Sequence, residues 1–186
     1  TELYVHTPCA SPSSPPQCNL LEATITSCTA SSEYSDQWSC DKAYDGKRPA
    51  WGEPGTDITW ATRGEGVGSW IELAFGKFSP DAMRFSNRQF DSSAESNKGL
   101  QLNFTFLSQS GVASIATRQV ELIERTADVD DWTYLHRFEP VAGATSVRIT
   151  VLSVYAKVNN GASEIALYDS RDCELSSFEL SSFVST

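Results

Sequence analysis

The sequence has no apolar run of the ~20 residues needed to cross a bilayer. Its longest apolar stretches, such as 147–154, contain a polar residue at every second or third position. The chain starts at Thr1 without a charged segment followed by an apolar one, so we expect any signal peptide to be absent already. The pattern predicts no transmembrane helix.

Histidine is scarce, since the chain contains only His6 and His136. The sequence also lacks a G-x-S-x-G turn, an H-E-x-x-H motif and a credible Ser-His-Asp order. Carboxylates are plentiful, which leaves a glycosidase-type carboxylate pair open as the alternative. We expect a protein that is not an enzyme.

Paired cysteines of the C-x-x-C type are missing, which together with two histidines argues against zinc. Widely spaced cysteines indicate disulfides and an oxidising compartment. Cys28 and Cys40 flank a short polar loop that a disulfide would close. Cys173 would tie down the N-terminal segment through Cys18 or Cys9. Five cysteines are an odd number, so one is free or pairs outside the chain.

Positive charge is in deficit: 14 Lys and Arg face 24 Asp and Glu, for a formal net charge of -10. An acidic surface repels nucleic-acid phosphates and anionic membranes. An acidic surface is compatible with a divalent cation or a neutral sugar as a ligand. The charge therefore argues against nucleic acid and membrane lipid as partners.

The 186 residues suit one well-buried domain. Residues 1–19 are rich in Pro and Ser, which is typical of an extended arm. Residues 174–186 contain a short near-duplication, which we interpret as a tail or linker. We expect the folded domain to span 20–173.

Period-two alternation of apolar and polar residues dominates the domain. It is clear at 70–75, at 100–106, where Leu100, Leu102, Phe104 and Phe106 share one face, at 147–151 and at 165–167. Residues 23–29 are rich in Thr and Ile. Such runs between Gly, Asn, Asp and Ser clusters predict half-buried antiparallel strands. With almost no helical periodicity, the sequence predicts an all-β sandwich or jelly roll.

Several motifs along these strands, in this order and spacing, resemble the discoidin-like or coagulation-factor type C domains of the galactose-binding-like superfamily. The matching segments are Ala43-Tyr44-Asp45-Gly46, 61–73 with Trp70-Ile71-Glu72-Leu73, 83–88, 146–151 and 161–168. The resemblance covers about residues 20 to 170 and is closest to the branch found in secreted carbohydrate-active and adhesive proteins. It implies a jelly-roll β-sandwich that accompanies catalytic domains rather than catalysing.

The resemblance also implies a structural Ca²⁺ ion. Asp45 and Glu164 would supply carboxylates, Lys42, Ala50 and Ala162 would supply backbone carbonyls, and Asp57 would join them. Calcium prefers ~6–8 oxygen ligands, which a loop of carbonyls with two carboxylates can supply. The alternative is an Asx-turn at Asp45 and a solvated carboxylate at Glu164.

In this fold, loops at one end of the rigid sandwich determine specificity. An aromatic face stacks on a sugar ring, while Arg, Asp and Asn bind its hydroxyls. For Trp38 the alternative is a plug at the end of the core. The candidate ligand contacts are Tyr34 and Trp38 in 31–40, Arg88, Phe90 and Asp91 in 87–98, and Tyr155 and Asn159 in 154–160.

These features predict an extracellular, non-catalytic module that binds a glycan or glycoprotein. The alternative is a protein–protein interaction or structural domain of a secreted or cell-surface assembly. In that case the proline-rich arm, the odd cysteine and the tail would contact neighbours. A sequon at Asn103-Phe104-Thr105, on an outward strand face, permits glycosylation.

Overall fold

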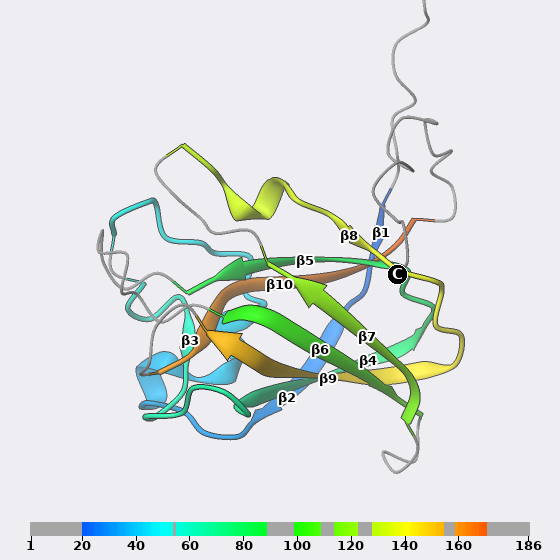
Figure 1. Cartoon of the computed structure of the whole chain (residues 1–186), viewed down its shortest axis with the longest axis horizontal. Helices are drawn as coiled ribbons and strands as arrows, with labels where there is room; N and C mark the ends of the chain where they lie inside the picture. Colours follow the sequence, from blue (N-terminus) through cyan, green and yellow to red (C-terminus); the bar gives the residue numbers. More distant parts are fainter. Residues whose placement is uncertain are drawn as a thin grey trace, which may run out of the picture.

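The computed structural model describes residues 20–53, 55–88, 99–108, 114–122, 128–154 and 159–170. Over these ranges the chain forms two antiparallel sheets packed face to face (Figure 1). The first sheet has the order β1-β10-β5-β8, with β3 also paired to β10, and the second has the order β2-β4-β9-β6-β7. The predicted all-β jelly-roll sandwich is confirmed.

The strands of the first sheet are β1 (Leu21–Glu22), β3 (Trp60–Ala61), β5 (Ala82–Asn87), β8 (His136–Arg137) and β10 (Gly161–Asp169). Those of the second are β2 (Ile25–Ala30), β4 (Trp70–Phe78), β6 (Gly99–Leu107), β7 (Ser114–Glu121) and β9 (Ala144–Val154). Three short 3-10 helices complete the described elements: η1 (Asp36–Trp38), η2 (Cys40–Ala43) and η3 (Asp131–Thr133). None of the described helices is long and apolar enough to cross a membrane.

Alternation along the strands builds the core between the two sheets. The inward residues predicted on β4, β6, β9 and β10 are buried there, apart from Leu100, whose side chain lies outside the described part of the chain. Trp60 of β3 is buried with them, at 2% exposed. The buried inward residues of the four strands are Ile71, Leu73, Phe75, Leu102, Phe104, Phe106, Val147, Ile149, Val151, Ile165 and Leu167.

A bulge in β10 determines which way its side chains point. Ala162 pairs with Asn87 and Glu164 pairs with Ser86, so one extra residue of β10 lies between these two pairs. Both Ala162 and Ile165 therefore reach the core although they are three positions apart. Bulges re-aim side chains in this way. Here the result is that Glu164 points away from the core-facing row that starts at Ile165.

Candidate functional site

The segments around Tyr34, around Ala61 and Thr62, and around Asn160 meet at one end of the sandwich. Backbone hydrogen bonds join them: Tyr34 N–H donates to the Ala61 carbonyl at 2.7 Å, and Thr62 N–H donates to the Asn160 carbonyl at 2.8 Å. In Figure 1, η1, η2, β3 and the start of β10 gather at this end. The candidate ligand residues of the first and third predicted loops thus share one end of a rigid scaffold.

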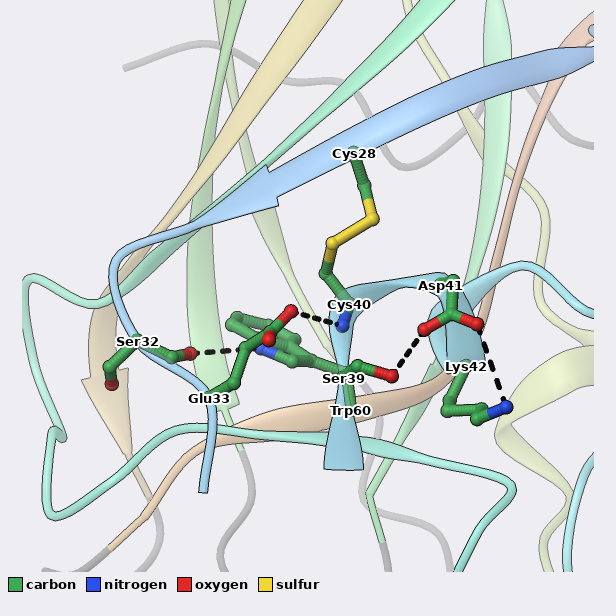
Figure 2. The surroundings of a disulfide bond; sticks show 8 residues. All are labelled: Cys28, Ser32, Glu33, Ser39, Cys40, Asp41, Lys42 and Trp60. Atoms are coloured by element: carbon green, nitrogen blue, oxygen red, sulfur yellow. Dashed lines mark hydrogen bonds and ion pairs between the residues drawn. A yellow bond between two sulfur atoms is a disulfide. The ribbon is translucent and has the colours of Figure 1, made fainter. Parts of the chain in front are cut away.

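A disulfide fixes the first of these loops. It joins Cys28 of β2 to Cys40 of η2, as predicted from the sequence (Figure 2). Glu33 accepts a hydrogen bond from the Cys40 backbone N–H at 2.7 Å, and the Trp60 indole Nε1 donates to the Ser32 carbonyl at 3.2 Å. The loop is thereby attached both to the second sheet and to the buried tryptophan of β3.

The two predicted aromatic residues of this loop lie in different environments. Tyr34 is 49% exposed, whereas Trp38 is 7% exposed. Arg88 lies over the Trp38 ring, with its guanidinium carbon 4.5 Å from the ring centroid. Arg88 is itself buried, and this burial lowers its pKa to about 10, against the smaller opposite effect of the Tyr34 charge. Trp38 and Arg88 therefore form a buried stack, and Tyr34 is the exposed ring beside it.

Arg63 and Asn159 flank the same loop end. The backbone N–H of Arg63 donates to Ser32 Oγ at 3.0 Å. The guanidinium Nη2 of Arg63 donates to the Tyr34 carbonyl at 3.3 Å. Asn159, which has a left-handed φ of 46°, accepts a hydrogen bond from the Gly64 N–H through Oδ1 at 2.6 Å. The sequence predicted Asn159 but missed Arg63, because only the pairing of Tyr34 with Ala61 brings Arg63 to this loop. Phe90, Asp91 and Tyr155 lie outside the described residues.

Asp45 lies close enough to Glu164 to affect its ionisation, and the Asp45 carboxylate also pairs with Lys47 at 3.7 Å. The Gly46 N–H, from the loop that holds Asp45, donates to Glu164 Oε2 at 3.1 Å. Glu164 is 6% exposed. Burial in the first place, and the negative charge of Asp45 in the second, raise the pKa of Glu164 to about 8. Asp45 does form the Asx-turn of the alternative interpretation, by accepting from the Lys47 N–H at 3.0 Å, but Glu164 is not solvated.

The other predicted metal ligands differ in their burial and in their contacts. Ala162 is buried in β10, Lys42 lies in η2 beside that strand, and the Ala50 carbonyl already accepts from the Glu53 N–H at 3.1 Å. Asp57 is exposed, with a left-handed φ of 66°. Within the described ranges no three His, Cys, Asp or Glu side chains gather to hold a metal ion. Of the predicted carboxylate ligands, Asp45 and Glu164 interact, and the negative charge of Glu22 also raises the pKa of Glu164. Cys18 and Cys173, the other predicted disulfide, lie outside the described residues.

Comparison by sequence finds no matching protein-family profile and no matching curated protein. Comparison by structure finds the F5/8 type C domain of a Bacteroides fragilis protein, with a TM-score of 0.62 and 16% identity over 84% of this chain and 99% of that chain. A module of Clostridium perfringens of the CBM32 class, in complex with GalNAc-β-1,3-galactose, gives a TM-score of 0.53 and 18% identity over 77% of this chain and 94% of that one.

A truncated AlyQ, with CBM32 and alginate lyase domains, gives a TM-score of 0.57 and 14% identity. It covers 82% of this chain, which spans only 34% of that longer protein. At these identities the likeness concerns the fold. The chain has the discoidin-like fold, as the sequence motifs predicted.

Proposed function

We propose that this chain is an extracellular, non-catalytic binding module that holds a glycan on the loops at one end of its sandwich. Proteins that share its fold are named as carbohydrate-binding modules, including one bound to 4,5-unsaturated mannuronic acid and one bound to GalNAc-β-1,3-galactose. This likeness supports a glycan as the ligand.

The exposed ring of Tyr34 is the observation that carries the proposal. An exposed aromatic face suits the apolar side of a sugar ring, and neighbouring polar groups suit its hydroxyls. The loop that carries Tyr34 is held by the Cys28–Cys40 disulfide and by the Trp60 indole. A loop that is already fixed loses less conformational entropy when a ligand binds.

A glycan array followed by isothermal titration calorimetry tests this proposal. We expect Tyr34→Ala to weaken glycan binding by about tenfold or more, since stacking on an aromatic ring is lost. Tyr134→Ala is the matched control, because Tyr134 is similarly exposed at 40% but lies between η3 and β8. Equal losses in the two variants, or no glycan binding by the wild-type protein, would contradict the proposal. In the second case a protein–protein interaction domain becomes the better hypothesis.

We further propose a structural Ca²⁺ ion between Asp45 and Glu164. Two carboxylates placed together with little exposure fit a hard divalent cation, which prefers oxygen ligands. The carbonyls predicted at Lys42, Ala50 and Ala162 would complete the set, with Asp57 as a further candidate. Bound calcium would fix the loop of Asp45 against β10, since it would offset the repulsion between the two carboxylates.

Thermal unfolding with CaCl₂ and with EDTA tests the calcium site. A ligand that binds only the folded state adds ~2.7 kcal/mol of stability at ~100 times its Kd. We expect this shift in the wild-type protein, and its loss in Asp45→Asn and Glu164→Gln. Asp36→Asn, which removes an exposed carboxylate of η1, serves as the control that keeps the shift. A wild-type protein stripped of metal that does not respond to calcium would contradict the site.

The Cys28–Cys40 disulfide supports an oxidising, extracellular setting, because disulfides persist in such compartments. A glycan or a glycoprotein is the partner that fits this setting. Localisation of the full-length protein to the secreted or cell-surface fraction, with the disulfide intact on non-reducing mass spectrometry, is the expected result.

A further inference from the structure

Arg63 presents a positive charge at the backbone of Tyr34, the residue whose ring is exposed. Its backbone N–H is bound to Ser32 Oγ, and one guanidinium nitrogen donates to the Tyr34 carbonyl at 3.3 Å. A guanidinium carries five N–H donors in a planar fork. Because Arg63 is exposed, the remaining donors are available to a ligand that contacts Tyr34.

Two other arginines of this acidic protein are engaged with carboxylates. Arg48 makes a two-pronged contact with Asp130, with the shorter distance at 2.7 Å, and Arg148 pairs with Glu72 at 2.8 Å. In the part of the chain that the structure describes, no carboxylate forms an ion pair with Arg63. Its charge is not neutralised by a neighbour in the way that those of Arg48 and Arg148 are.

The nearest carboxylates of the loop end are used to hold the loops. Glu33 accepts from the Cys40 N–H at 2.7 Å, and half-buried Glu65 accepts from the Ser31 hydroxyl at 2.5 Å. Both therefore act within the scaffold. Glu33 and Glu65 keep their negative charges, but neither forms an ion pair with Arg63 in the described part of the chain.

We propose that the glycan bound at this end is acidic, a chain that carries uronic-acid carboxylates, and that Arg63 selects it. This inference rests on the proposed glycan-binding function. The planar fork of arginine matches a carboxylate with two parallel hydrogen bonds, which a neutral sugar cannot accept in the same way. Tyr34 would stack on the ring while Arg63 binds its carboxylate. A net charge of -10 disfavours anions on most of the surface, so a local cation at the proposed site is needed to hold an acidic group.

Matched pairs of oligosaccharides provide the test. Oligogalacturonate and oligomannuronate are compared with their carboxyl-reduced forms, which keep the chain but lose the charge, by isothermal titration calorimetry on the wild-type protein. We expect the acidic form of at least one pair to bind about tenfold more tightly, since charge-assisted hydrogen bonds are the stronger ones. This preference should shrink as salt is raised, because exposed charges are screened.

The variants Arg63→Ala and Arg63→Gln should lose the preference for the acidic form while the affinity for the neutral form changes by less than about twofold. Arg118→Ala is the matched control, since Arg118 of β7 also donates to a backbone carbonyl, at 2.9 Å, and its loss changes the net charge equally. Equal affinity for the acidic and reduced forms overturns the acidic preference and leaves the glycan function intact. A loss in Arg63→Ala no greater than in Arg118→Ala overturns the role of Arg63. If no oligosaccharide of either kind binds while the glycan array identifies a neutral ligand, the acidic preference is overturned and the glycan-binding function stands.

Discussion

The guanidinium carbon of Arg88 lies 4.5 Å from the centroid of the Trp38 ring, and both side chains are less than a tenth exposed. Cation–π contacts of this kind contribute ~2 kcal/mol or more when they are removed from water. The pKa of Arg88, although lowered to about 10 by burial, keeps the guanidinium charged at neutral pH. Because the stack stabilises the loop that exposes Tyr34, it supports the proposed site indirectly.

We predict that Trp38→Ala lowers the free energy of unfolding by about 3–5 kcal/mol, the usual cost of emptying a buried tryptophan site. Tyr34→Ala, in the same loop but half exposed, should change it by no more than about 0.5 kcal/mol. Urea denaturation of the two variants measures both values. If Trp38→Ala keeps its stability and loses only glycan binding, Trp38 contacts the ligand directly and its interpretation as buried support is wrong.

Removing the Cys28–Cys40 disulfide should destabilise the protein by about 3 kcal/mol, because the bond closes a short loop in the unfolded chain. The double variant Cys28→Ala/Cys40→Ala, compared with the wild-type protein in urea without reductant, measures this difference. Adding reductant to the double variant provides the control, since it reports only on the remaining cysteines. Equal unfolding midpoints for the two proteins would show that the loop is held by its other contacts alone.

The strands could be predicted where one face is buried and the other is exposed. At β4, β6 and β9 the alternation in sequence matches the observed burial. In β10 the alternation correctly places Ile165 and Leu167 in the core, but it does not show that the opposite face is covered too. Both β5 and β10 are almost entirely buried, because η3 packs against β5 and η2 packs against β10. At the sheet edge, β2 begins at Ile25 instead of Ala23, since Ala23 donates to the Leu167 carbonyl of the other sheet.

The candidate site could be predicted only in part. Local composition identified Tyr34 as a loop aromatic, and the short spacing identified Cys28 with Cys40. The burial of Trp38 depends on Arg88, 50 positions away in the sequence, and the place of Arg63 depends on pairing between Tyr34 and Ala61. No local pattern encodes such long-range contacts. The bulge that re-aims Glu164 is likewise invisible in the alternation of β10.

Gly161 should tolerate no side chain. A Cβ at this position would overlap the carbonyl oxygen of Trp60, on the neighbouring strand β3. We predict that Gly161→Ala separates β3 from β10 and lowers the free energy of unfolding by about 3 kcal/mol, the upper range for overpacking. Gly76→Ala is the control, because a Cβ there meets nothing within 4 Å. Similar urea midpoints for the two variants would contradict this account.

Stability should fall as the pH rises from about 4.5 to about 8 when calcium is absent. The pKa of Glu164 is raised from 4.5 to about 8, so the folded state keeps a proton that the unfolded state releases in this window. The state that binds more protons is destabilised relative to the other as the pH rises, and here that state is the folded one. Urea denaturation in EDTA at several pH values measures the slope, and Glu164→Gln, which cannot titrate, should flatten it.

Saturating calcium should flatten the same slope in the wild-type protein. An ion between Asp45 and Glu164 needs both carboxylates ionised, so binding at pH 7 releases the proton that Glu164 otherwise keeps, and calcium affinity rises with pH up to about 8. Calorimetry in buffers of different ionisation enthalpy counts this proton. In Asp45→Asn the repulsion by Asp45 is gone, so the slope in EDTA should become shallower and the calcium response should disappear. A calcium response with no proton release would place the ion elsewhere, whereas a pH slope without any calcium response would leave Glu164 as a buried neutral acid.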